Sequence, residues 1–174
     1  MVTTLLTTHH VGGRAGTRTF PSMKYFEKDL VNVLYEADES SISGIKKETH
    51  YLPSKTIILP DCLSGSAGKR KFYIYNNRYF SSLYPLKPEQ TGAYSFDSQF
   101  GWDTDPKALS IVETLTLDTV TLDEVVKREK SENIPSPDFL SLDTQGSELE
   151  ILKGGEFAIR NTVVAIAREV SFTQ

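Results

Sequence analysis

The chain has 174 residues, the length of a single domain, and 39% of them are apolar, which is enough for a core. Its formal net charge of −4 argues against a general electrostatic affinity for nucleic acid, because that affinity needs a basic surface. With one cysteine, Cys62, it has no intrachain disulfide, and the expected compartment is the reducing cytoplasm. No apolar run approaches the ~20 residues that span a bilayer. We therefore expect one cytoplasmic domain over residues 1–174, without a membrane span.

Short runs of apolar, β-forming residues alternate with segments that suit helices, which is typical of a parallel sheet with helical crossovers. In the first half of the chain we expect strands over residues 2–11, 30–36 and 56–59, and helices within 17–29 and over 39–49. Pro21 suits the first turn of the earlier helix, where a missing N–H is tolerated. His9 and His10 are adjacent on the first strand, so they should point to opposite faces and are not expected to share a metal ion.

The second half of the chain contains further strand patterns and two helix patterns. We expect a long loop over residues 76–110 and strands over 71–75, 114–120, 138–143 and 162–172. Thr121 and Glu124 have the spacing of a capping box, in which each side chain satisfies a free N–H group at a helix start. That helix should run to about Lys130. A short helix over 147–153 should end at Gly154-Gly155, which suits a C-terminal cap.

A glycine-rich turn, Gly12-Gly13-Arg14-Ala15-Gly16, follows the first strand. Glycine lets the backbone bend sharply and approach a ligand closely, and the helix N-terminus that follows favours an anionic or nucleotide group. Glu36 comes 20 residues after Gly16 at the end of the second strand, where an acid binds ribose hydroxyls in dinucleotide-type folds. Together these features indicate a nucleoside-containing ligand. A simple turn and a solvated acid would produce the same pattern.

Asp143 ends a buried strand, and ligands in open α/β sheets bind beyond the carboxyl ends of the strands. Glu148 follows in Asp143-Thr144-Gln145-Gly146-Ser147-Glu148 and could share the same cleft. For Asp143 a functional role is favoured. For Glu148 a purely structural role, in which Ser147 and Glu148 cap the first turn of the next helix, is equally consistent with the sequence.

The stretch Asp138–Gly155, DFLSLDTQGSELEILKGG, resembles the signature of FkbM-type methyltransferases. Motifs upstream of it resemble those of the family, and they occur in the family's order. They are the glycine loop Val11–Thr17, Glu36-Ala37-Asp38 at the second strand end, Cys62-Leu63-Ser64 with Gly68, Ser81-Ser82-Leu83, and Thr121-Leu122-Asp123-Glu124.

The resemblance implies a Rossmann-like fold, S-adenosylmethionine (SAM) as cofactor, and methylation of a hydroxyl group on a small-molecule or glycan-type acceptor. It implies that Gly12, Gly13, Arg14 and Gly16 face the methionine and ribose portions, and that Glu36 binds the ribose hydroxyls. It places Ala37, Cys62 and Leu63 near the adenine. Asp143 would lie beside the methionyl end and the acceptor, as the first candidate for the general base, with Glu148 as the second.

The chain departs from the family pattern at three points. His10 stands where the family often has an acid, and Ser141 stands where a lysine is common. The chain ends at Gln174, before the helix and the antiparallel strand pair that normally complete the fold. The strand over 162–172 should then be an exposed edge, which predicts a homodimer, aggregation, or a fragment of a longer protein.

Two other functions stay open. A nicotinamide oxidoreductase would share the fold and the spaced acid. The chain lacks a full G-x-G-x-x-G, however, and its Tyr-x-x-x-Lys sequence, Tyr51 to Lys55, contains Pro53, which disfavours a helical catalytic pair. A truncated, inactive SAM-binding scaffold would be consistent with the missing C-terminal strands.

Overall fold

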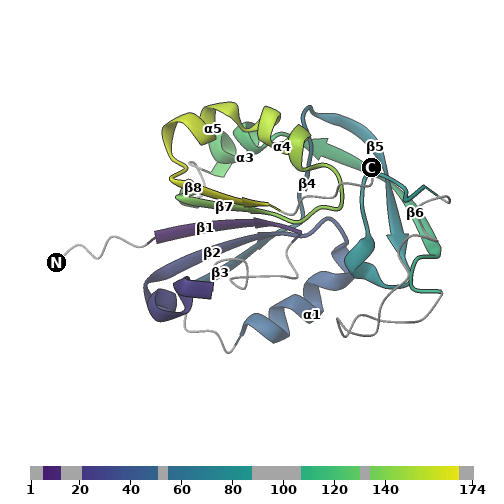
Figure 1. Cartoon of the computed structure of the whole chain (residues 1–174), viewed down its shortest axis with the longest axis horizontal. Helices are drawn as coiled ribbons and strands as arrows, with labels where there is room; N and C mark the ends of the chain where they lie inside the picture. The colour runs from purple at the N-terminus through teal and green to yellow at the C-terminus, as the bar shows by residue number, and fades with distance from the viewer. Residues whose placement is uncertain (1–5, 13–20, 51–54, 88–106, 130–133, 169–174) are drawn as a thin grey trace.

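A five-stranded, entirely parallel sheet forms the centre of the structure, a computed structural model that describes residues 6–12, 21–50, 55–87, 107–129 and 134–168 (Figure 1). The strand order is β3-β2-β1-β7-β8, and each neighbouring pair runs parallel. The strand bounds are β1 (Leu6–Val11), β2 (Leu30–Tyr35), β3 (Lys55–Leu59), β7 (Phe139–Leu142) and β8 (Ala165–Arg168). The predicted mostly parallel α/β fold of the Rossmann-like type is confirmed.

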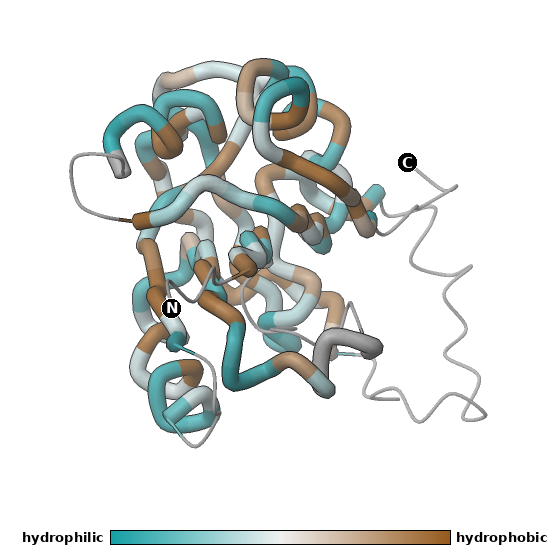
Figure 2. Tube along the Cα trace, turned by 90° about the vertical axis from the view of Figure 1, so that its left-hand side faces the viewer, coloured by the Kyte–Doolittle hydropathy of each residue, from teal (hydrophilic) through white to brown (hydrophobic). Residues whose placement is uncertain are grey.

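Helices cover both faces of this sheet. Of the described helices, α3 (Leu122–Glu129), α4 (Glu148–Gly154) and α5 (Glu156–Asn161) lie on one side, and α1 (Glu39–Thr49) lies on the opposite side (Figure 1). The larger hydrophobic core joins Val33 and Leu142 of the sheet with Val125, Ile151 and Ala158 of the three helices. Hydrophobic and hydrophilic residues alternate along the outer helices (Figure 2), because only one stripe of each helix faces the sheet.

A second, three-stranded sheet lies at the carboxyl ends of the parallel strands. Its order is β4-β6-β5, with β4 (Cys62–Leu63), β5 (Gly68–Tyr75) and β6 (Ile111–Val120). The sequence predicted strands near β5 and β6, but it did not show that they pair antiparallel with each other in a separate sheet. Within the range expected as a loop, the short 3-10 helix η3 (Arg78–Phe80) follows β5. The chain then returns through α3 to β7, beside β1.

Local signals placed several helix ends correctly. The Glu124 carboxylate accepts a hydrogen bond from the Thr121 N–H at 2.8 Å, and the Thr121 hydroxyl accepts one from the Glu124 N–H at 3.1 Å, so the capping box is confirmed. Pro21 begins the 3-10 helix η2 (Pro21–Asp29), in the region where a helix was expected.

The pair Gly154-Gly155 ends α4 as predicted, but for a different reason. Neither glycine has the positive φ of a left-handed cap, and Gly155 has a φ of −113°. A Cβ atom on Gly154 would lie 2.6 Å from the Ser64 carbonyl oxygen. A Cβ atom on Gly155 would lie 2.8 Å from a Leu122 methyl carbon. Close packing against backbone therefore requires glycine at position 154, whereas at position 155 a side chain would need Leu122 to shift.

The two adjacent histidines of β1 are both buried, with His9 and His10 each 1% exposed. The His9 ring forms hydrogen bonds with the Tyr35 hydroxyl at 2.8 Å and with the Pro135 carbonyl oxygen at 3.0 Å. Burial lowers the pKa of each ring to about 4, so both rings are neutral at pH 7. In the described ranges, no group of three His, Cys, Asp or Glu side chains gathers closely enough to hold a metal ion.

β8 is the outermost strand of the parallel sheet in the part of the chain that the structure describes. A homodimer formed through this edge stays a prediction. None of the helices in the described ranges is both long and apolar enough to cross a membrane.

Candidate functional site

One cavity, of about 240 Å³, opens where the carboxyl ends of the central strands meet the second sheet. Parallel strands end at the same edge, so residues far apart in the sequence lie together there. The cavity lining contains six of the residues that the sequence singled out: Gly12, Glu36, Ala37, Cys62, Leu63 and Asp143. Gly13, Arg14 and Gly16, which the sequence also singled out, lie outside the described residues.

Gly12 begins the turn after β1, and its conformation requires glycine for two reasons. Its φ of +86° is in the left-handed region, which side chains disfavour. A Cβ atom would also lie 2.0 Å from the carbonyl oxygen of Asp143. The Gly12 N–H donates to the Tyr35 carbonyl oxygen at 3.2 Å, and the Asp143 N–H donates to the Val11 carbonyl oxygen at 3.0 Å. The first turn and the Asp143 loop therefore pack directly against each other.

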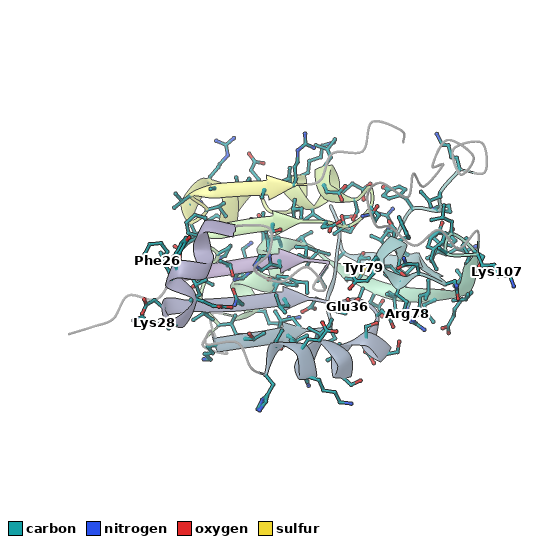
Figure 3. All side chains as sticks on the ribbon, turned by 60° about the horizontal axis from the view of Figure 1, so that its bottom comes forward. Phe26, Lys28, Glu36, Arg78, Tyr79 and Lys107 are labelled. Atoms are coloured by element: carbon teal, nitrogen blue, oxygen red, sulfur yellow. The ribbon has the colours of Figure 1, made fainter. Side chains whose placement is uncertain are left out.

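Glu36 follows β2 and is 6% exposed. Its carboxylate accepts a hydrogen bond from the Asp38 N–H at 2.9 Å, which fixes the backbone that leads into α1. Figure 3 shows Glu36 at the carboxyl end of β2, near Arg78 and Tyr79, whereas Phe26 lies at the opposite end of the sheet. Glu36 is therefore a buried acid at the carboxyl end of its strand, where the sequence predicted one.

Asp38 links α1 to η3, the 3-10 helix that follows β5. It is the N-cap of α1, and its carboxylate accepts hydrogen bonds from Ser40, Ser41 and the Arg78 guanidinium, the last at 2.5 Å. Burial raises the pKa of Asp38, but the hydrogen bonds from the two serines and from Arg78 outweigh burial and hold the pKa below its ordinary value. The ionised Asp38 therefore anchors Arg78 at the cavity wall.

Cys62 and Leu63 form β4 and supply an apolar part of the wall. Burial raises the pKa of the Cys62 thiol to about 12, so the thiol stays protonated at neutral pH and is unsuited to nucleophilic chemistry. Beside them, Asp61 lines the cavity and forms an ion pair with Arg128 of α3 at 2.6 Å.

Asp143 lies at the start of a sharply bent loop after β7. Its carboxylate accepts a hydrogen bond from the Gln145 side-chain amide at 2.9 Å. Gln145 has a φ of +55°, and among the described residues it is the one non-glycine residue with a positive φ. Such a conformation persists only where its surroundings hold it, and it is commonly found at functional sites.

Glu148 is close to Asp143 in sequence, but it does not line the cavity. Its side chain is buried, with 8% of the residue exposed. One carboxylate oxygen accepts hydrogen bonds from the Thr144 N–H at 2.8 Å and the Thr144 hydroxyl at 3.0 Å. The other accepts one from the Gly146 N–H at 3.0 Å. Glu148 thus holds the loop from within. The alternative in which Ser147 and Glu148 cap the first turn is met only in part, because Ser147 is the N-cap of α4 but makes no side-chain cap hydrogen bond.

The wall opposite the strand ends comes from β5, from η3 and from the residues just after η3, and it was not predicted. Its residues are Phe72, Arg78, Tyr79, Ser81 and Leu83. The one signal in the sequence was the Ser81-Ser82-Leu83 motif, which resembles a family loop but does not say where that loop lies. The β-bridge between Tyr73 and Ser82 fixes the loop beside β5.

The cavity therefore offers a backbone turn after β1, two buried or half-buried acids after the strands on either side of β1, and an apolar wall. A model of the methyltransferase FkbM domain matches residues 10–174, nearly the whole chain. Searches among curated proteins and among solved structures gave no match. The family match and the parallel sheet with its cavity at the carboxyl ends agree, and the chain belongs to the FkbM methyltransferase family.

Proposed function

We propose that this protein transfers a methyl group from SAM to a hydroxyl group of a small-molecule or glycan-type acceptor. The observation that carries the proposal is the convergence of Gly12, Glu36 and Asp143 on one cavity, each at the carboxyl end of a different parallel strand. We propose further that residues 1–174 act as a single SAM-binding domain.

The residues of the cavity fit the chemistry of SAM. The Glu36 carboxylate is a hydrogen-bond acceptor of the kind that ribose hydroxyls require. The apolar surfaces of Ala37, Cys62 and Leu63 suit an adenine ring. The turn at Gly12 gives the methionyl portion close access to the backbone.

SAM supplies an electrophilic methyl group: its carbon–sulfur bond breaks with the electron pair left on sulfur, while a bond forms between that carbon and the acceptor oxygen. The protein aligns the two partners, and orientation of this kind contributes up to roughly 7–11 kcal/mol. We assign to Asp143 the removal of the acceptor proton. Glu148, with both carboxylate oxygens bonded to its own loop, is assigned the support of that loop.

Calorimetric titration of the chain with SAM tests the binding half of the proposal. Glu36→Gln should weaken SAM binding by about tenfold, because it replaces charge-assisted hydrogen bonds with neutral ones. Glu39→Gln is the matched control, since Glu39 is an exposed acid of the neighbouring helix. Binding of NAD(P) in place of SAM would support the oxidoreductase alternative and contradict the proposal.

Formation of S-adenosylhomocysteine in the presence of a panel of hydroxylated acceptors tests the transfer half. Asp143→Asn should reduce turnover far more than SAM affinity. Equal turnover in the variant would remove Asp143 from the base role. SAM binding without transfer to any acceptor would support the scaffold alternative.

A further inference from the structure

Asp143 differs from two other acids near the cavity in the group that binds its carboxylate. Those two acids are bound to arginine, which cancels their charge: Asp38 pairs with Arg78 at 2.5 Å, and Asp61 pairs with Arg128 at 2.6 Å. In the described part of the chain no lysine or arginine pairs with Asp143. Its carboxylate is bound by the neutral amide of Gln145 instead. A neutral donor orients a carboxylate and leaves its negative charge uncompensated.

Gln145 is itself held from outside the cavity. The Ser82 hydroxyl lies 3.0 Å from the Thr144 carbonyl oxygen and 2.8 Å from the Gln145 carbonyl oxygen, to which it donates. The same hydroxyl accepts a hydrogen bond from the Tyr84 N–H at 3.1 Å. Ser82 is 2% exposed, so solvent does not compete for these bonds. Ser82, which is bridged to Tyr73 of β5, therefore maintains the left-handed conformation at Gln145, and in that conformation the Gln145 side-chain amide donates to Asp143.

We propose that Gln145 is a positioning residue, which turns an uncompensated Asp143 carboxylate toward the cavity so that the site prefers the positively charged methyl donor to its neutral product. This inference rests on the proposed function. SAM carries a positive charge at its sulfonium, and S-adenosylhomocysteine lacks that charge at its thioether. A fixed negative charge beside the sulfur would stabilise bound SAM and would not stabilise bound S-adenosylhomocysteine. The same arrangement lowers product inhibition, because the attraction ends when the methyl group leaves.

The measurement is the ratio of the dissociation constants for S-adenosylhomocysteine and SAM, obtained by calorimetry at fixed low ionic strength. Asp143→Asn should lower the ratio by about fivefold, the size expected for one partly exposed ion pair. Gln145→Met removes the amide and keeps an unbranched side chain of similar length, so the strain at φ +55° is unchanged. It should lower the ratio by about threefold. Ser82→Ala should change the ratio in the same direction, and Ser82→Thr, which keeps a hydroxyl, should restore it.

Asn161→Met is the matched control, because it removes an exposed amide that donates to the Phe157 carbonyl oxygen far from Asp143 in the sequence. It should leave the ratio unchanged. If Asp143→Asn lowers the ratio and Gln145→Met does not, the positioning role of Gln145 is wrong. If neither variant changes the ratio, the charge of Asp143 does not select the donor. Failure of the parent chain to bind either compound would instead overturn the proposed function, so the two failures are distinguishable.

Discussion

The two buried histidines of β1 make the stability of this protein depend on pH. His9 and His10 have pKa values lowered from 6.5 to about 4, chiefly by burial. A lowered pKa means that the folded state binds a proton more weakly than the unfolded state does. The stability that the protein has with both rings neutral is therefore fully present above about pH 6.5 and is lost as the pH falls toward 4.

The magnitude follows from the two pKa values. A pKa difference of one is worth about 1.4 kcal/mol, so each ring contributes at most about 3 kcal/mol between the two limits. At pH 5 about 2 kcal/mol of this is already lost for each ring, or about 4 kcal/mol for both. This is a large part of the ~5–15 kcal/mol that holds a typical domain folded. The repulsion between His9 and His10 is already part of the lowered pKa of His9 and adds nothing further to this loss.

Urea denaturation at pH 8 and at pH 5 measures the effect. The His9→Gln/His10→Gln double variant should lose about 4 kcal/mol less than the parent chain between these two pH values. The comparison cancels the contribution of the carboxylates to the pH dependence of stability, because they titrate in both proteins. Each single variant should remove about half of the difference. His50→Gln, which removes an exposed histidine, is the matched control and should behave like the parent chain. Equal losses in the parent and the double variant would refute the argument.

Two further predictions concern single residues. Gly12→Ala should destabilise the fold by at least about 3 kcal/mol in urea denaturation, because strain at positive φ adds to the overlap with the Asp143 carbonyl oxygen. Gly44→Ala is its control: a Cβ atom there meets nothing within 4 Å, and the variant should stabilise α1 by about 0.5–1 kcal/mol. Both predictions fail if the two variants have similar stability. Cys62 should react with a thiol reagent at pH 8 about a thousandfold more slowly in the native protein than in urea, because its raised pKa lowers the fraction of the reactive thiolate. Comparable rates would show that the thiol is not held in a buried site.

Much of the architecture was readable from local patterns. The strands near β1, β2, β3, β7 and β8 and the helices α1, α3 and α4 were predicted close to their positions, because runs of apolar residues, capping residues and turn residues act over a few positions in the chain. The tendency of parallel strands to end together was enough to predict that Gly12, Glu36 and Asp143 share one edge.

The roles of several residues depended on partners distant in sequence. Gly154 gives room to the Ser64 carbonyl, and Arg78 binds Asp38 at the cavity wall. No local pattern contains such contacts, because they form only when the second sheet packs across the strand ends. The amino-acid sequence by itself therefore determined the fold class and the acids at the strand ends. The tertiary structure decided which groups bind the acids near the cavity, because the arginines that pair with Asp38 and Asp61 lie 40 and 67 residues away in the sequence.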